Sequence, residues 1–245
     1  KNFIFNDKKT SEIYFKFSSL VSKYIKNKSF VVAVSGGPDS MALAFLANHF
    51  SYENNKKGHF VLIDHGIRKN SKKEAIKVKK ILNTKQIKLI ILRNKKKITR
   101  NVQKTAREVR YSLLSKFCIQ KKVKILITAH HKEDQIETFL IRLSRGSGVE
   151  GLSSMSQSTK LFNKITLLRP FLEFEKNQLQ YISNKIFKKT IKDPSNKDKK
   201  FLRTNIRDLT KILSQKGLNL DQIVRSIKNI SSTKDAINHY VNLSL

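Results

Sequence analysis

The stretch Ser35-Gly36-Gly37-Pro38-Asp39-Ser40 follows a short apolar run, Phe30 to Val34, and leads into the apolar-patterned segment Asp39 to Phe50. A continuous apolar run that ends in glycine is typical of a buried parallel strand, and the next segment has helical spacing. Glycines permit a sharp turn that brings backbone N–H groups against an anion, and a following helix adds the positive end of its dipole. The stretch therefore predicts a strand–loop–helix unit that cradles a phosphate.

The side chains of this loop point to the same chemistry. Ser35 and Ser40 supply hydroxyl donors, whereas Asp39 supplies a carboxylate. A carboxylate beside a phosphate repels it unless a cation lies between them, so we expect Mg²⁺ at Asp39. The loop is not a Walker A sequence, because no Gly-x-x-x-x-Gly-Lys-Ser/Thr occurs in the chain.

Strand-like and helix-like segments alternate through the front half of the chain. Further strands are predicted at Phe60–Ile63, Ile87–Leu92 and Val123–Thr128, with helices at Ser71–Leu82, Asn101–Gln120 and Lys132–Arg145. This alternation predicts an α/β fold, in which a parallel sheet carries helices on both faces.

After Arg145 the pattern changes. The sequence predicts an extended segment at Lys160–Arg169 and helices at Glu173–Phe187, Lys199–Leu213 and Asp221–Val241. We therefore expect a catalytic domain over residues 1–210 and a small helical C-terminal segment over residues 211–245.

The composition of the chain indicates which kinds of partner and which cellular setting to expect. Lys and Arg number 51 against 18 Asp and Glu, a formal net charge of +33. A polyanion such as RNA is the natural partner, because each phosphate contact releases counterions. Lysine is abundant along the whole chain, however, including positions with no functional appearance, so the charge also has a purely compositional explanation. Charge alone does not distinguish tRNA from DNA.

No run of about 18 apolar residues occurs, so no membrane association is expected. The single cysteine, Cys118, excludes an internal disulfide and fits a reducing, cytoplasmic setting.

Further motifs accompany the loop in a fixed order. They are Asp64-His-Gly-Ile-Arg68, Asn101-Val-Gln103 with Ala106-Arg107-x-x-Arg110-Tyr111, Thr128-Ala-His130-His131-x-x-Asp134-x-x-Glu137-Thr138, and Arg145-Gly-Ser-Gly148-x-x-Gly151. With the first loop they resemble the tRNA(Ile)-lysidine synthetases, which belong to the PP-loop ATPases (adenine nucleotide alpha-hydrolase-like fold). A last segment, Asp193-Pro-Ser-Asn196 with Phe201, Arg203 and Arg207, is similar to the end of that family's catalytic domain. Thr204 departs from the family's usual Arg-Asn-x-x-Arg.

The resemblance implies a carbon–nitrogen ligase. Members of this family cleave ATP between the α and β phosphates and adenylate the C2 carbonyl oxygen of the wobble cytidine in the isoleucine tRNA with a CAU anticodon. The ε-amine of free L-lysine then attacks C2, and AMP leaves. The longer members carry extra C-terminal domains that help to grip tRNA, whereas only the segment 211–245 follows the resemblance here.

The resemblance also assigns residues. ATP binding is implied for Ser35, Gly36, Gly37, Pro38, Asp39, Ser40, Asp64, His65, Arg110 and His130, with Asp39 also at the metal. Catalysis and lysine binding are implied for Asp134, Glu137 and Arg110, and tRNA binding for Arg145, Arg203 and Arg207.

The acidic pair has its own physical reading. Asp134 and Glu137 are three residues apart, so they share a helix face, expected to lie opposite the apolar residues Ile136, Phe139, Leu140 and Leu143. Two carboxylates there suit the ammonium of lysine, and one could accept its proton. The alternative is that acids are simply favoured at a helix N-terminus.

Two other functions stay open. The chain could be another PP-loop tRNA-modifying enzyme, such as a thiolation enzyme, but those use catalytic or cluster-binding cysteines and this chain has one. It could also be an inactive RNA-binding module of the same fold, which predicts erosion of Asp39, Asp134 or Glu137, and all three are present. The oligomeric state is left open.

Overall fold

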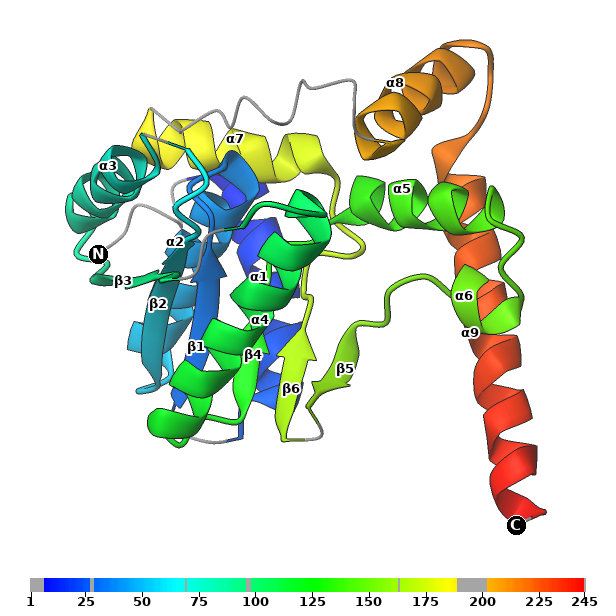
Figure 1. Ribbon diagram of the computed structural model, residues 1–245, viewed down its shortest axis with the longest axis horizontal. Helices are drawn as coiled ribbons and strands as arrows, with labels where there is room; N and C mark the ends of the chain where they lie inside the picture. Colours follow the sequence, from blue (N-terminus) through cyan, green and yellow to red (C-terminus); the bar gives the residue numbers. More distant parts are fainter. Residues whose placement is uncertain are drawn as a thin grey trace. The chain divides into compact units, whose positions relative to one another are not determined.

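The computed structural model describes residues 7–26, 29–68, 70–95, 98–162, 164–188 and 202–244 (Figure 1). The described residues fall into two compact units. The first lies within Lys1–Ala129, Ser158–Phe171 and Lys176–Lys192, and the second within His130–Gln157, Leu172–Glu175 and Asp193–Leu245. The motif Asp193–Asn196 and Phe201 lie outside the described residues.

The first unit is built on a sheet. Its strands are β1 (Ser29–Val34), β2 (Lys57–Asp64), β3 (Leu89–Arg93), β4 (Ile125–Ile127), β5 (Ser158–Leu161) and β6 (Ile165–Leu168). Its helices are α1 (Lys8–Tyr24), α2 (Pro38–Glu53), α3 (Ser71–Asn83), α4 (Val102–Gln120) and α7 (Lys176–Phe187). The strand order is β3-β2-β1-β4-β6-β5, and all neighbours pair in parallel except β5 with β6. The predicted parallel α/β fold is confirmed, with one antiparallel strand added at an edge.

Helices cover both faces of the sheet. In Figure 1, α4 lies in front of the strands and α1 and α2 lie behind them. On the α4 side, Val31 of β1 packs in one cluster with Leu114 and Cys118. On the other side, the ring of Phe30 meets that of Phe50 of α2, with centroids 6.1 Å apart. Successive residues of β1 thus face opposite layers, which is why the strand had to be apolar throughout.

The path of the chain places the phosphate loop at a special point of the sheet. From the central strand β1 the chain moves outward to β2 and β3, then returns through α4 to β4 on the other side of β1. Open α/β sheets bind their ligands where the strand order reverses in this way, at the carboxyl ends of the strands. Residues 35–40 follow β1 and Thr128 follows β4, so the loop lies at that reversal.

The second unit is helical. It contains α5 (Lys132–Leu143), α6 (Val149–Leu152), α8 (Leu202–Gln215) and α9 (Leu220–Leu243). Helices α8 and α9 pack against α5, and α9 also packs against α6. Ion pairs join Lys132 to Asp221 and, at 2.7 Å, Lys234 to Glu150. The boundary predicted at 210/211 falls within α8, and the assignment of a catalytic role to residues 1–210 stays a prediction.

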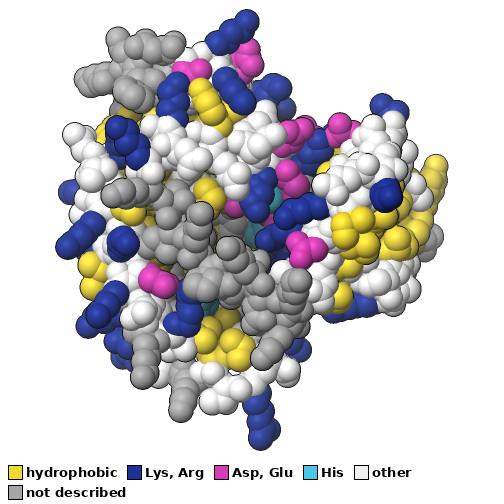
Figure 2. Space-filling model, turned by 90° about the horizontal axis from the view of Figure 1, so that it is seen from above, with side chains coloured by type: hydrophobic (Ala, Val, Ile, Leu, Met, Phe, Trp, Pro, Cys, Tyr) yellow, Lys and Arg dark blue, Asp and Glu magenta, His cyan; other side chains and the backbone are white. Residues whose placement is uncertain are grey.

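None of the helices in the described residues is both long enough and apolar enough to cross a membrane. Figure 2 shows Lys and Arg side chains spread over the whole visible face rather than gathered in one stripe. The net charge is therefore a general property of this surface, and a nucleic-acid contact must be argued from local geometry.

Candidate active site

The hydroxyl of Ser40 holds the loop after β1 in shape. Its Oγ accepts hydrogen bonds from the backbone N–H groups of Ser35 and Gly36, both at 3.1 Å, and donates to the carbonyl of Gly37 at 2.9 Å. The exposed Ser35 adds a contact to Ser40 Oγ at 3.0 Å. Because the single proton of Ser40 is already donated inside the loop, its role in this conformation is to shape the loop rather than to donate to a phosphate.

Gly36 is the glycine that the loop cannot replace. Its φ of +90° is a left-handed conformation, and a Cβ at this position would lie 2.5 Å from Cγ2 of Val78 in α3. The neighbouring Gly37 is different, since its Cβ would meet only Ser35 Oγ at 3.8 Å. The two glycines therefore have different roles. Gly36 allows the backbone to turn close to α3, whereas Gly37 leaves the space beside the loop open.

Asp39 stands in the first turn of α2, with Pro38 at the start of the helix. The first backbone N–H groups of a helix have no acceptor within it, so an anion at this end is stabilised. Among the described residues, no group of three or more His, Cys, Asp or Glu side chains is arranged to hold a metal ion. Mg²⁺ is commonly bound by one or two carboxylates together with substrate phosphates, so Asp39 alone suits a metal that arrives with a nucleotide.

The end of β2 contributes Asp64 and His65. One oxygen of the buried Asp64 carboxylate accepts the backbone N–H of Gly66 at 3.0 Å, and Gly66 has a φ of +67°. Asp64 thus caps the turn after β2. Burial, and then the nearby charge of Arg110 on α4, lower the pKa of His65 to about 4, against a smaller opposing effect of Asp64. His65 is consequently a neutral imidazole at neutral pH, and Arg110 is brought close to it from the long helix.

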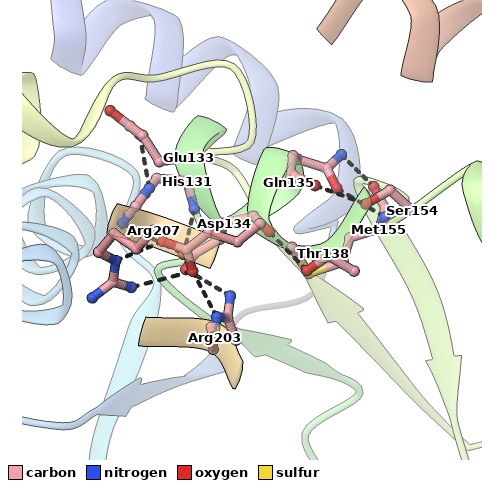
Figure 3. A network of polar contacts seen from close by, with 10 residues as sticks. His131, Glu133, Asp134, Gln135, Thr138, Ser154, Met155, Arg203 and Arg207 are labelled. Atoms are coloured by element: carbon pink, nitrogen blue, oxygen red, sulfur yellow. Dashed lines mark hydrogen bonds and ion pairs between the residues drawn. The ribbon is translucent and has the colours of Figure 1, made fainter. Parts of the chain in front are cut away.

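The second unit brings the predicted acidic pair together with two of the predicted RNA-binding arginines (Figure 3). Arg203 bridges both carboxylates: its Nη2 lies 2.8 Å from Asp134 Oδ1 and its Nε lies 2.7 Å from Glu137 Oε2. Arg207 binds Glu137 alone, through Nε at 2.7 Å from Oε1 and Nη2 at 3.2 Å from Oε2. The side chain of Glu137 is 3% exposed, so two guanidinium groups neutralise a buried carboxylate.

The start of α5 adds two histidines to this cluster. The backbone N–H of His131 donates to Asp134 Oδ2 at 3.1 Å, and His131 Nδ1 lies 2.9 Å from Glu133 Oε2. Burial acts to raise the pKa of Asp134, but the positive charges of His131, Arg203 and His130, together with that hydrogen bond, outweigh it and hold the pKa below its usual range. Asp134 is therefore a fixed anion and a weak proton acceptor.

Arg145 lies apart from these contacts. It is exposed in the turn after α5, next to Gly146 with its φ of +69°.

Two residues of α5 that the sequence analysis did not select bind the backbone of the segment that follows Arg145. Gln135 pairs with the backbone of Met155 in both directions, at 2.7 and 2.8 Å, and Arg142 donates to the carbonyls of Gly151 at 2.6 Å and Ser154 at 3.0 Å. Neither residue carried a sequence signal beyond its place on α5.

The predicted residues thus form two groups, each within one unit. The first unit holds Ser35–Ser40, Asp64, His65 and Arg110, and the second holds His130, Asp134, Glu137, Arg145, Arg203 and Arg207. Within the second group, sequence reasoning missed the pairing between acids and arginines. A signal was present, since Asp134 and Glu137 are spaced by three and Arg203 and Arg207 by four, so each pair occupies one face of its helix.

Comparison with known proteins bears on both groups. The PP-loop domain family matches residues 9–213. The tRNA(Ile)-lysidine synthase of Wolbachia pipientis wMel is 37% identical over 238 residues, covering 95% of this chain and 55% of the relative. That of Anaplasma marginale is 38% identical over 219 residues, covering 88% of this chain and 47% of the relative. This chain therefore spans about half the length of the curated relatives that it matches.

Among solved structures, the U34-tRNA thiolase from Methanococcus maripaludis with its [4Fe-4S] cluster shares the fold, with a TM-score of 0.75 at 17% identity over 91% of this chain and 79% of the thiolase. The loop at the strand-order reversal, the sheet around it and the family match over residues 9–213 agree, and the chain belongs to the PP-loop domain family.

Proposed function

We propose that this chain is a carbon–nitrogen ligase with the activity of a tRNA(Ile)-lysidine synthetase. The observation that carries the proposal is the Ser35–Ser40 loop at the strand-order reversal, in a chain 35–38% identical to proteins of that name over most of its length. The substrates in this proposal are ATP, free L-lysine and an isoleucine tRNA with a CAU anticodon.

The first unit suits the activation step. The loop and the start of α2 hold the pyrophosphate part of ATP while the C2 carbonyl oxygen of the wobble cytidine bonds to the α phosphorus and pyrophosphate departs. Arg110 places a positive charge where the α phosphate gains negative charge in the transition state. Asp39, together with the phosphates of ATP, would hold Mg²⁺, which would supply positive charge beside the pyrophosphate.

The second unit suits the lysine step. The ε-amine bonds to C2, AMP leaves with the bonding pair, and a proton is lost from nitrogen. Asp134 holds a cation as a fixed anion, because its pKa is low. In this proposal Glu137 accepts that proton after one of its two arginine partners is displaced. Arg203 and Arg207 occupy the positions around Glu137 that an ammonium would take, so in this proposal lysine binding replaces one of the two cations.

A thiolation reaction is disfavoured by the chemistry of this chain. Burial raises the pKa of the only cysteine, Cys118, to about 12, so its thiol stays protonated at neutral pH. A protonated, fully buried thiol is a poor nucleophile and a poor ligand for a cluster. The likeness to the thiolase, at 17% identity, supports the fold alone.

The proposal is tested by incubating the chain with ATP, Mg²⁺, radiolabelled lysine and a CAU-anticodon isoleucine tRNA transcript, then counting label retained in RNA. Label should require ATP and the wobble cytidine, and should be lost in Asp39→Asn and Glu137→Gln. Asp208→Asn is the matched control, because Asp208 is half exposed and 3.9 Å from its lysine partner. Equal labelling of a transcript whose wobble base is uridine would contradict the proposal.

A further inference from the structure

A groove at the amino-terminal edge of the sheet is left unexplained by the reaction. The groove has a volume of about 630 Å³. The groove is lined by residues from the end of α2, the end of α3 and the start of β3: Tyr52, Lys79, Asn83, Gln86, Lys88 and Leu89. All of them belong to the first unit.

The lining combines three kinds of group. Tyr52 is 65% exposed, so its ring is available for stacking. Lys79 and Lys88 are exposed cations, and Asn83 and Gln86 add amide donors and acceptors. None of the described residues that line the groove is acidic. An aromatic ring flanked by cations and amides is the usual equipment for holding an unpaired nucleotide, because the ring stacks on the base and the cations meet the phosphates.

The surroundings continue the same charge. Lys57 begins β2, the strand next to β3, and Lys121 follows α4. Both lie near His59, because after burial their charges are the causes that lower the pKa of that imidazole. Positive side chains at the start of β2, just before β3 and just after α4 therefore lie at the same amino-terminal edge of the sheet. Several cations along one edge suit an RNA backbone better than a single small anion.

The groove is well separated from the phosphate loop. Helix α2 begins at the loop and ends beside Tyr52, and its 16 residues span about 24 Å at roughly 1.5 Å per residue. A single ligand that occupies both the loop and the groove must therefore be a polymer. The cations, amides and aromatic ring of the groove suit an RNA chain.

We propose that the groove formed by Tyr52, Lys79, Asn83, Gln86 and Lys88 is a second RNA-binding site, which holds an unpaired nucleotide of the tRNA that is modified at the opposite edge of the sheet. The choice of tRNA rests on the proposed function; the preference for an unpaired nucleotide rests on the groove alone. The site adds affinity for RNA without touching the reacting atoms.

Filter binding of the CAU-anticodon tRNA transcript to the full chain tests the stacking part. Tyr52→Ala should weaken binding roughly tenfold, since base stacking on an aromatic side chain is worth about that or more, whereas Tyr52→Phe should bind like the parent. Phe15→Ala is the control, because Phe15 is 59% exposed on α1, a helix that contributes no residue to the lining of the groove. Equal affinities for Tyr52→Ala and Phe15→Ala would overturn the proposal.

The salt dependence tests the charged part. The double variant Lys79→Glu, Lys88→Glu should flatten the slope of log Kd against log salt by about 1.4, as expected for two lost phosphate contacts on single-stranded RNA. Lys16→Glu, Lys23→Glu is the matched control, with both lysines exposed on α1. Equal slopes for the two double variants would overturn the proposal.

Lysine transfer separates this proposal from the proposed function. At saturating tRNA, Tyr52→Ala should keep the parental rate of lysine incorporation; a fall in that rate would place Tyr52 in the reaction and overturn its role as a remote contact. If no variant or parent incorporates lysine but Tyr52→Ala still weakens RNA binding, the groove stands and the lysidine proposal fails.

Discussion

Arg207 donates two hydrogen bonds to Glu137, with Nε 2.7 Å from Oε1 and Nη2 3.2 Å from Oε2, and the Glu137 carboxylate is almost fully buried. Sequence motifs assign the first residue to RNA and the second to lysine. The structure instead joins them in one charge cluster, so the state of one depends on the other.

Removing one partner of this pair should be costly. Arg207→Met leaves part of the buried negative charge of Glu137 uncompensated, and we expect a loss of about 3–5 kcal/mol in the free energy of unfolding. The double variant Glu137→Gln, Arg207→Met should lose less than the sum of the two single losses, because the charge and its partner are removed together. Urea unfolding of the four proteins in the cycle measures the coupling.

An exposed pair provides the comparison. Lys228 and Glu173 are 2.6 Å apart but 60% and 65% exposed, so the same cycle there should give at most about 1 kcal/mol. A coupling free energy between Glu137 and Arg207 no larger than this would contradict the expectation that the buried pair is more strongly coupled than an exposed one.

The two loop glycines should respond differently to alanine. Gly36→Ala forces a left-handed backbone and a clash with Val78, so we expect a loss of about 2–4 kcal/mol and a fall in melting temperature of roughly 4–12 °C. Gly37→Ala meets only an ordinary contact and should stay within about 1 kcal/mol. Thermal unfolding of both variants decides, and equal losses would contradict the described loop.

The hydroxyl of Ser40 should matter more than that of Ser35. Ser40→Ala leaves the Gly37 carbonyl and two backbone N–H groups without their partner, at a cost of about 1–3 kcal/mol. Ser35→Ala removes an exposed hydroxyl that makes one contact, so its cost should be smaller. Chemical unfolding gives both values, and a larger loss in Ser35→Ala would reverse the assigned roles.

His65 should titrate far below an ordinary histidine. Its ring signal in a proton NMR titration should have a midpoint near pH 4. Arg110→Ala should raise that midpoint, because the charge of Arg110 disfavours the imidazolium. Arg107→Ala is the control, since Arg107 stacks over Tyr111, with the guanidinium carbon 4.9 Å from the ring centroid.

The same shift has a consequence for stability. An unfolded chain binds the His65 proton near the usual pKa of 6.5, whereas the folded protein binds it only near 4. The contribution to folding is therefore fully present above pH 6.5 and is lost as the pH falls toward 4. Unfolding measured across this range should be less pH-dependent in His65→Gln, and an unchanged dependence would contradict the buried, neutral imidazole.

The strands and the phosphate loop could be predicted from sequence because their signals are local. Phe30 to Val34 is apolar on both faces, and glycine and proline mark the turn that follows. The helix α1 was not predicted, although Ile13, Phe17 and Val21 recur at helical spacing and are buried. Its apolar residues are interrupted by Lys16 and Ser18, which weakens the pattern.

The surroundings of the acidic pair could not be predicted, because they depend on contacts about 70 residues apart in sequence. The expected arrangement, with the acids opposite the apolar residues of α5, is wrong for Glu137. That residue is 2% exposed beneath α8, whereas Leu143, expected in the apolar stripe, is 50% exposed. Arg203 and Arg207 of α8 cover the face of α5 that carries Glu137, which the sequence of α5 alone does not indicate.

The most direct test of the central claim follows the α phosphate of ATP. The chain is incubated with the CAU-anticodon transcript, Mg²⁺ and ATP labelled at the α phosphorus, without lysine. The account predicts label joined to the tRNA, dependent on Asp39 and the wobble cytidine, and released as AMP when lysine is added. Labelled ADP with no label on the tRNA would mean cleavage at the wrong bond and would contradict the account.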